Sequence, residues 1–429
     1  DVYKRQEKNG RIDISKALGI NEKFQKSRQF WSHQLNNGIL TDPSEFINPV
    51  PHVSFAQGEI QVDYLKRRYD VLSEKHMFPG MQFSADDSVF AEKLPLMAQG
   101  RDFSNKVAIS WTDAGTDVNF GALTKQFLTA AKASGTEIRY GHEVIDIKRD
   151  GSSWKVYSKN KHTGDITVVK AKFVFVGAGG YALDLLRKAK VKEVAGYAGF
   201  PVSGLWLRSK NPELIEQHQA KVYGKAAVGA PPMSVPHLDT RVIDGEKGLL
   251  FGPYGGWSPK FLKKGSYLDL FKSIRPDNIT SYLGVAVQEF GLTKYLVDEV
   301  RKNFSDRVET LREYVPEAKE SDWETVIAGQ RVQVIKPAGA PQFGSLEFGT
   351  TLVNNQEGNI AGLLGASPGA SITPAVMLEL LERCFGEHMI DWADKIREMV
   401  PSYGIKLRND EKLYDEMWEY TQKTLKLDR

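Results

Sequence analysis

The chain contains 429 residues, of which 41% are hydrophobic and 26% are charged, as is ordinary for a soluble globular protein. This composition excludes a disordered, collagen-like or coiled-coil chain, and the length predicts two or three domains. The net charge is +3, from 57 basic and 54 acidic residues, so nucleic acid is not an expected partner. The single cysteine, Cys384, excludes a disulfide framework and a cysteine-based zinc site, and no metal site is predicted.

Helical and extended patterns alternate through the first half of the chain. Residues 21–35 and 64–72 have the apolar spacing of helices, whereas the prolines near residues 46–55 permit at most an edge strand there. A further helix is expected at about 122–133, ended by a glycine at position 135. Strands are then expected at 138–147, 154–158, 166–171 and 173–176, the first three joined by turns.

A first glycine-rich turn, Gly177-Ala178-Gly179-Gly180, lies between the apolar strand at 173–176 and a helix. It fits the pattern G-x-G-x-x-[G/A], in which glycines let the backbone approach a pyrophosphate at a helix N-terminus. No acidic residue follows at about 20 positions, so it is not a primary dinucleotide fingerprint. A tight structural turn is the alternative interpretation.

A second glycine-rich turn occupies residues 365–371, about 190 residues later, after a short apolar strand at 360–364. Thr373 is a candidate cap for the helix that follows, with Pro374 at its first position. Two such turns, far apart in sequence, predict one α/β domain that is interrupted by a second domain.

Eight segments resemble the malate:quinone oxidoreductase family, flavoproteins of the broader glutathione-reductase-like and amino-acid-oxidase-like group. They are residues 29–31, 46–55, 115–121, 172–180, 224–241, 328–333, 365–371 and 400–404. Members of the family begin with a strand–G-x-G-x-x-G–helix unit that binds the ADP half of FAD. The chain starts at Asp1 without that unit, so we interpret it as N-terminally truncated, with the first nucleotide-binding βαβ unit missing.

The resemblance implies an α/β fold in which an interrupted, glutathione-reductase-like FAD-binding domain carries a substrate domain built on an antiparallel sheet. The expected FAD-binding domain comprises residues 11–40, 104–194 and 329–400. The expected substrate domain comprises residues 41–103 and 195–328, and residues 401–429 are expected to form a C-terminal helical tail.

The resemblance also implies oxidation of (S)-malate to oxaloacetate in the tricarboxylic acid cycle, with hydride transfer to FAD and electron delivery to a membrane quinone. Two alternatives stay open. One is a sibling FAD-dependent enzyme that oxidises another 2-hydroxy acid, such as 2-hydroxyglutarate, or uses oxygen as acceptor. The other is an inactive truncated fragment.

Because quinones reside in lipid, the expected location is cytoplasmic, with peripheral association to the cytoplasmic membrane. Aromatic and aliphatic residues alternate with basic ones between positions 257 and 275, which predicts an interfacial patch. A solvated face above a core stripe is the alternative. The predicted apolar contacts are Trp257, Phe261, Leu262, Tyr267, Leu268 and Phe271.

Malate oxidation requires cations for two carboxylates and a base for the hydroxyl proton. His237 is the predicted base and Arg331 the second catalytic residue, since a planar guanidinium can hold a carboxylate by two bonds. Arg241, His52 and Lys336 are predicted to bind substrate, and His52 is also the rival base. For each histidine and arginine, a structural hydrogen bond or salt bridge is the alternative.

The predicted flavin ligands come from four parts of the chain. The second turn should place N–H groups and a positive helix end near the flavin pyrimidine edge. Val144 fits the position whose backbone contacts adenine in this flavoprotein group. The whole prediction requires Gly179 and Gly369 to share a cavity lined by Arg331. The predicted cofactor-binding residues are Val144, Gly177, Ala178, Gly179, Thr116, Asn119, Gly365, Ala366, Ser367, Pro368 and Gly369.

Overall fold

A computed structural model describes residues 7–8, 11–224, 236–365 and 369–428. Its largest element is a nine-stranded mixed sheet, in which the β13–β4 pair is parallel. In order across the sheet, the strands are β17 (Gly344–Glu347), β16 (Glu324–Pro337), β12 (Ala198–Ser209), β15 (Glu246–Gly256), β14 (His237–Ile243), β13 (Lys221–Tyr223), β4 (His52–Gln57), β6 (Val107–Thr112) and β5 (Gln82–Ser84).

The prediction of at most an edge strand at 46–55 is wrong. β4 pairs with β13 on one side and with β6 on the other, so it lies inside the sheet. The prolines precede the strand and therefore leave its N–H groups available, and Val53 and Phe55 bury their side chains in the main core. A separate short strand, β3 (Ile47–Pro49), pairs with β7 (Thr116–Val118).

The predicted strand patterns in the middle of the chain are confirmed. β8 (His142–Asp150), β9 (Ser153–Asn160) and β10 (Ile166–Ala171) form an antiparallel meander. β11 (Val174–Val176) lies beside β19 (Ile360–Gly365) in parallel register, and β18 (Thr350–Asn354) completes this small sheet. Segments about 185 residues apart are thus neighbours, while the chain between them contributes most of the large sheet.

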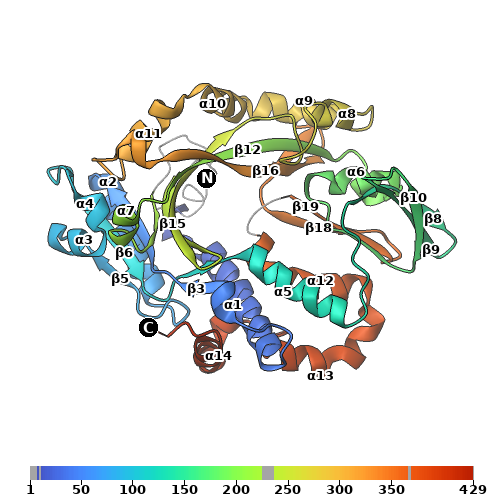
Figure 1. Cartoon of the computed structure of the whole chain (residues 1–429), viewed down its shortest axis with the longest axis horizontal. Helices are drawn as coiled ribbons and strands as arrows, with labels where there is room; N and C mark the ends of the chain where they lie inside the picture. Colours follow the sequence, from blue (N-terminus) through green and yellow to red (C-terminus); the bar gives the residue numbers. More distant parts are fainter. Residues whose placement is uncertain (1–6, 9–10, 225–235, 366–368, 429) are drawn as a thin grey trace.

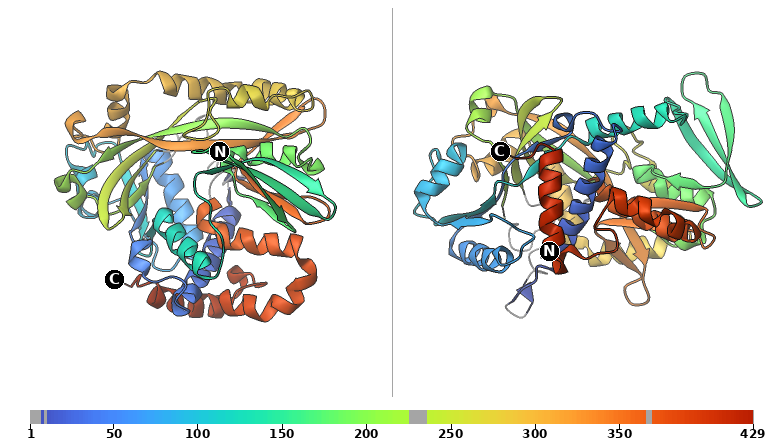
Figure 2. Two further views of the ribbon diagram at one scale, coloured as in Figure 1. Left: turned by 45° about the vertical axis from the view of Figure 1, so that its right-hand side comes forward. Right: turned by 90° about the horizontal axis from the view of Figure 1, so that it is seen from below.

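Helices cover both sides of the molecule (Figure 1). One row lies along the outer side of β12 and β16 and consists of α8 (Asp269–Ser273), α9 (Ile279–Gln288), α10 (Phe290–Arg301) and α11 (Phe304–Arg312). The opposite side carries α1 (Ser15–Asn36), α5 (Phe120–Ala133), α12 (Thr373–Cys384), α13 (Met389–Met399) and α14 (Glu411–Thr424). Figure 2 shows the same two layers from other directions. The remaining helices, α2 (Glu59–Ser73), α3 (Asp87–Lys93), α4 (Pro95–Ala98), α6 (Ala182–Lys188) and α7 (Pro212–Glu216), lie at the two ends.

Hydrophobic packing joins distant segments in both layers. The helices α3, α4 and α11 pack on the large sheet through buried residues such as Phe90, Met97 and Leu311. On the other side, Trp31 of α1 packs with Leu425, and Arg28 of α1 lies over the Trp418 ring, so the expected C-terminal helical segment is fastened to α1. Burial of apolar area at roughly 25 cal/mol per Å² is the main force that holds these layers together.

The sheet boundaries differ from the expected domain boundaries at three strands. β6 lies within residues 104–194, and β17 and most of β16 lie within residues 329–400, yet all three belong to the nine-stranded sheet. In sequence, all or most of each strand belongs to the other expected domain. Pairing with strands elsewhere in the sequence therefore decides which sheet each strand joins.

Candidate functional site

The two glycine-rich turns meet at one cavity. β11 and β19 run parallel, so their carboxyl ends lie at the same edge of the small sheet, and a turn leaves each strand there. Gly177 and Gly179 from the first turn, and Gly365 and Gly369 from the second, line a cavity of about 480 Å³. Its other lining residues are Phe120, Thr350, Leu363, Ala370, Ser371 and Thr373.

Glycine is required in these turns for steric reasons. Gly179 and Gly365 adopt φ values of +56° and +86°, which side chains with a Cβ atom disfavour. A Cβ atom on Gly365 would lie 2.1 Å from the Gly349 carbonyl oxygen, and one on Gly180 would lie 2.2 Å from the Phe261 carbonyl oxygen. Ala366, Ser367 and Pro368 lie outside the described residues.

The N-terminal end of α12 also borders this cavity, through Ser371 and Thr373. The predicted cap is wrong: the helix begins at Thr373, with Ile372 at the cap position and no side-chain cap. The Thr373 hydroxyl instead donates to the carbonyl oxygens of Gly369 and Ala370. The first N–H groups of α12 therefore bring partial positive charge to the cavity without a capping side chain.

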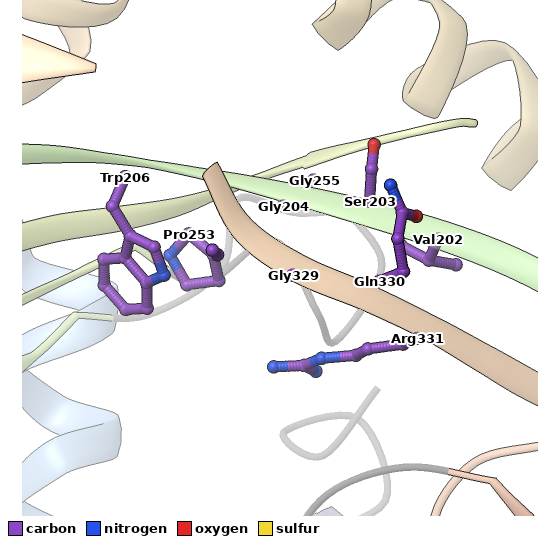
Figure 3. Close-up of a pocket in the computed structure, with 10 residues that line it drawn as sticks. Val202, Ser203, Gly204, Trp206, Pro253, Gly255, Gly329, Gln330 and Arg331 are labelled. Carbon is purple, nitrogen blue, oxygen red and sulfur yellow. The ribbon is translucent and has the colours of Figure 1, made fainter. Parts of the chain in front are cut away.

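A second cavity, of about 280 Å³, is lined by residues of β12, β15 and β16. Arg331 lines this cavity rather than the glycine-lined one, and Figure 3 shows its side chain on the side of the strands opposite Ser203 and Gln330. The guanidinium has no hydrogen-bond or ion-pair partner among the described residues. Although the cavity admits solvent, the surrounding protein desolvates the group and lowers the pKa of Arg331 below its usual value.

Close packing connects the two cavities. Val332, the neighbour of Arg331 on β16, has a side-chain carbon 2.8 Å from the position that a Cβ atom on Gly180 would occupy. Gly180 belongs to the first glycine turn, so Arg331 immediately precedes in sequence a residue that contacts this turn. The predicted single cavity is therefore two neighbouring cavities.

An aromatic ladder crosses adjacent strands of the large sheet. The rings of His52 on β4 and His237 on β14 both stack on Tyr223 of β13, with centroid distances of 4.9 and 4.5 Å. His237 also meets the edge of Trp206, at 4.9 Å, and Trp206 lines the Arg331 cavity. The two candidate bases are thus brought together, with His237 on the side of Arg331.

His237 lies next to a buried carboxylate. Its Nδ1 atom is 3.0 Å from Oδ2 of Asp239, two residues along the same strand and therefore on the same face. Burial raises the pKa of Asp239, but His237, Lys221 and Arg241 more than offset this effect and hold the pKa below its usual value. Asp239 is therefore charged near neutral pH and can orient the imidazole.

A second buried carboxylate engages Arg241. Nε of Arg241 lies 2.7 Å from Oδ1 of Asp117, and the same oxygen lies 2.8 Å from Nζ of Lys221. Lys221 also reaches Asp239, at 3.5 Å. The guanidinium of Arg241 is thus already paired with a buried anion, which favours the structural alternative over the predicted contact with substrate.

The His52 side chain is exposed at its surface, although much of the protein surrounds it. The limited solvation there lowers the pKa of His52 to about 4, and the charge of Arg68 adds to this effect. His52 is consequently neutral near pH 7 and is a weak base compared with an ordinary histidine.

The remaining predicted residues lie away from both cavity linings. Val144 is on β8 and is partly exposed, and Lys336 is on β16 opposite Ser345. Thr116 pairs with Pro49 in the β3–β7 ribbon. Asn119 caps α5 by accepting from the Ala122 N–H group and donates to Asp244. Ala178 packs against the core of the meander. The roles of these residues stay predictions.

Four residues of this region were missed by sequence reasoning: Trp206, Lys221, Tyr223 and Asp239. The alternation of Lys221 and Tyr223 on one face of β13, like that of His237 and Asp239 on β14, was visible in the sequence. The pairing of β13 with β14 was not visible in the sequence, and this pairing places Tyr223 opposite His237.

The predicted membrane segment is only partly exposed. Phe261 is buried against the first glycine turn, so its side chain is not available to a bilayer, and Trp257 is partly buried against a core cluster. Tyr267, Leu268 and Phe271 are exposed as predicted. Within the described ranges, no helix has the length and apolar character needed to span a membrane. The described residues also contain no cluster of three or more acidic, histidine or cysteine side chains arranged for a metal ion.

Comparisons with a family model and with known relatives all point to the same family. The family model for malate:quinone oxidoreductase (Mqo) matches residues 2–427. The probable malate:quinone oxidoreductase of Corynebacterium aurimucosum is 84% identical over 423 residues, which cover 98% of this chain and 85% of the relative. The malate:quinone oxidoreductase of Corynebacterium glutamicum is 70% identical over 422 residues, which cover 98% of this chain and 84% of the relative.

Solved structures show the likeness of fold at low sequence identity. L-proline dehydrogenase from P. horikoshii aligns with a TM-score of 0.52 and 13% identity, covering 84% of this chain and 77% of that one. L-alpha-glycerophosphate oxidase from Mycoplasma pneumoniae, solved with FAD bound, aligns with a TM-score of 0.52 and 14% identity, covering 85% of this chain and 80% of that one.

Proposed function

The chain belongs to the malate:quinone oxidoreductase family, and from this premise we propose how its residues carry out the reaction of that family. The protein oxidises (S)-malate to oxaloacetate and delivers the electrons to a quinone. FAD, when bound, supplies the acceptor for the hydride that leaves the hydroxyl-bearing carbon. The observation that carries the assignment of roles is an arginine, Arg331, that has no partner among the described residues and lines a cavity close to the glycine-lined one.

The glycine-lined cavity is the proposed site of the flavin. Its four lining glycines leave space that side chains would fill, and the first turn of α12 adds partial positive charge. These features fit a planar ring that takes on negative charge at one edge, and we place the pyrimidine edge at the second turn. In the second turn, we keep Ala366, Ser367 and Pro368 as proposed flavin-binding residues. In the first turn, we keep Gly177, Ala178 and Gly179 in the same role.

Arg331 is the proposed ligand of a malate carboxylate. A guanidinium can donate two parallel hydrogen bonds to one carboxylate, and this geometry orients the substrate as well as binding it. Arg331 is exposed in the cavity, pairs with none of the described residues and is partly desolvated, so an anionic ligand would restore solvation that the guanidinium has lost. The 280 Å³ cavity suits a small diacid.

His237 is the proposed base for the malate hydroxyl proton. With Nδ1 beside Asp239, the Nε2 atom is left to accept the proton, and the carboxylate stabilises the imidazolium that forms. His52 serves this role poorly, because an imidazole with a pKa of about 4 seldom holds a proton near neutral pH. We assign Arg241 and Lys221 to the support of Asp117 and Asp239.

We further propose that residues 11–40, 104–194 and 329–400 supply the FAD-binding unit, with β6, β17 and most of β16 transferred to the substrate-binding sheet. The electron acceptor, a quinone, is dissolved in lipid. This supports peripheral association of the enzyme with the cytoplasmic face of the membrane. Catalysis then occurs beneath a lipid surface from which the quinone is drawn.

The reaction can be tested on the FAD-loaded enzyme with a water-soluble quinone analogue or dye. (S)-Malate should bleach the flavin absorbance and support turnover, whereas 2-hydroxyglutarate at the same concentration should support little. Equal or faster turnover of 2-hydroxyglutarate would assign a different 2-hydroxy acid to the Arg331 cavity. Protein that stays colourless in the presence of added FAD would contradict the proposed flavin site.

A further inference from the structure

The helices α8 to α10 and the residues just before them expose a continuous row of apolar side chains. Val287 is 80% exposed and Phe290 is 67% exposed, which is unusual for such large apolar groups in succession. The helices lie in line along the outer side of the molecule (Figures 1 and 2). We call this surface the α8–α10 face, and it consists of Tyr267, Leu268, Phe271, Ile274, Ile279, Leu283, Val287 and Phe290.

The inner sides of these helices are firmly packed, so the exposed row is not needed for the core. The α9 helix buries Gly284 and Val285, and a Cβ atom on Gly284 would lie 2.3 Å from a carbonyl oxygen of the β16–β17 connection. The α10 helix buries Leu292 and Leu296 against strands of the large sheet. Positions 279, 283 and 287 share one face of α9 by their spacing, and this face points outward, while Phe290 is exposed at the start of α10.

The border of the α8–α10 face is basic at its α8 end, whereas Asp277 and Glu289 are the charged residues that flank α9. Residues 257–275 contain five basic side chains and a single acidic one, Asp269. The Oδ2 atom of Asp269 is turned inward, where it accepts from the Tyr181 hydroxyl and from the Phe261 and Ser266 N–H groups. Lys264 and Lys272 are exposed beside the apolar row. Apolar side chains with a basic border are the combination that binds an anionic lipid surface.

The same segment touches the cavity proposed for the flavin. A side-chain carbon of Leu262 lies 3.4 Å from the position of a Cβ atom on Gly179, which lines that cavity. The chain then runs from Leu262 to the exposed Phe271 within ten residues, and Asp269 ties this stretch to Tyr181 of the glycine turn. A lipid surface on the α8–α10 face would therefore lie on the side of the molecule nearest the first glycine turn.

We propose that the α8–α10 face is the surface by which the enzyme docks on an anionic lipid bilayer, and that it receives the quinone from that bilayer. This inference rests on the proposed function, because a quinone dissolved in lipid is the reason for a bilayer to be the occupant. It also shifts the predicted interfacial patch along the chain: α9 and the start of α10 carry much of the apolar contact, and the buried Phe261 carries none.

Vesicle binding tests the proposal with the FAD-loaded enzyme. The triple variant Leu283→Ser, Val287→Ser, Phe290→Ser should bind vesicles of phosphatidylglycerol and phosphatidylcholine on the order of tenfold or more weakly in a sedimentation assay. A matched control, Ile60→Ser with Ile390→Ser, changes side chains that are 83% and 85% exposed on α2 and α13, and it should bind as the parent does. Unchanged binding by the triple variant would overturn the proposal.

Two further measurements distinguish an anionic bilayer from a second copy of the chain as the partner of the α8–α10 face. The pair Lys264→Glu and Lys272→Glu should weaken binding to anionic vesicles, while Lys412→Glu on α14, whose side chain is 88% exposed, should not. A lipid-free dimer of the parent that the triple variant loses would overturn the bilayer in favour of a second copy of the chain.

Activity separates this proposal from the proposed function. Turnover of malate with a water-soluble dye should stay within about twofold of the parent in the triple variant, because its residues lie outside both cavities. Turnover with a long-chain quinone in vesicles should fall with vesicle binding. A parent enzyme that binds vesicles but does not oxidise malate would contradict the proposed function while leaving the docking surface supported.

Discussion

Replacing Arg331 by glutamine removes the cation from the 280 Å³ cavity and tests its proposed contact with malate. A hydrogen bond to a charged group contributes about 1.5–3 kcal/mol, and we take about 3 kcal/mol for a bidentate pair in a cavity that admits solvent. Since about 1.4 kcal/mol corresponds to a tenfold change, kcat/KM for malate should fall on the order of 10²-fold. Steady-state turnover with a dye acceptor measures this loss, and the flavin absorbance should stay unchanged.

The stability of the same variant provides a second readout. The Arg331 guanidinium has no partner among the described residues and is partly desolvated, so its removal should not lower the melting temperature. Arg331→Lys keeps the charge but loses the planar fork and should show an intermediate loss of kcat/KM.

A matched control lies on the neighbouring strand. Arg208 on β12 pairs with Glu324 on β16 at the surface, at 2.6 Å, and Arg208→Gln should cost about 1 kcal/mol or less in stability, with little change in turnover. The reasoning is refuted if Arg331→Gln keeps kcat/KM within about threefold of the parent. It is also refuted if the variant loses its flavin and melts early, because Arg331 would then be structural.

Three further substitutions test the other assignments. His237→Asn should lower turnover by about 10²-fold or more while flavin content holds, and near-normal turnover would reassign the base. Burial raises the pKa of Asp239, but His237 and nearby cations keep it below 3.8, so its carboxylate stabilises the fold above about pH 4 and this contribution is lost as the pH falls further. Asp239→Asn lacks that contribution, and its melting temperature should change less than that of the parent between about pH 5 and pH 3. Gly365→Ala, at φ +86° and with a Cβ atom 2.1 Å from a carbonyl oxygen, should destabilise the protein by roughly 1–3 kcal/mol and weaken FAD retention, whereas Gly386→Ala, with open space around it, should do neither.

The parts of the fold that could be predicted are those with a local signal. β10 has the bounds predicted for it, 166–171, because alternation and flanking turns define a hairpin strand within a few residues. The two glycine turns were recognisable in the same way, since each follows a short apolar strand and precedes a helix. Their meeting at one cavity followed from the rule that parallel strands end at the same edge of a sheet.

The large sheet could not be predicted, because its order depends on pairing between distant segments. β4 pairs with β13, about 170 residues later, and nothing near residue 52 indicates that partner. The prolines before β4 suggested an edge, yet proline removes only its own N–H group and not those of the residues after it. Phe261 was misjudged for a related reason, since its burial depends on contact with Gly180 on another segment.

Arg241 and Arg331 look alike in the sequence, and their surroundings separate them. Arg241 lies beside Asp117, which sits on β7 more than 100 residues earlier, whereas Arg331 faces a cavity without such a carboxylate among the described residues. An arginine in a strand therefore predicts an anion nearby but not whether that anion is a side chain or a ligand. Only the three-dimensional pairing decides, and here it divides two equal candidates into a structural residue and a proposed binding residue.

In the proposed arrangement, the proton leaves the malate hydroxyl and the electrons leave the adjoining carbon as hydride, toward different sides of the molecule. The proton passes to His237, whose neighbours Asp239 and Lys221 continue across β14 and β13 toward Asp117. The electrons leave toward the first glycine turn, which the segment around Leu262 joins to the α8–α10 face. A bilayer on that face would exclude water from the side on which the electrons leave. The charged network beside His237 lies away from that face, within the large sheet. An enzyme that oxidises a water-soluble acid and reduces a lipid-soluble quinone needs this separation, because its two substrates arrive from different phases.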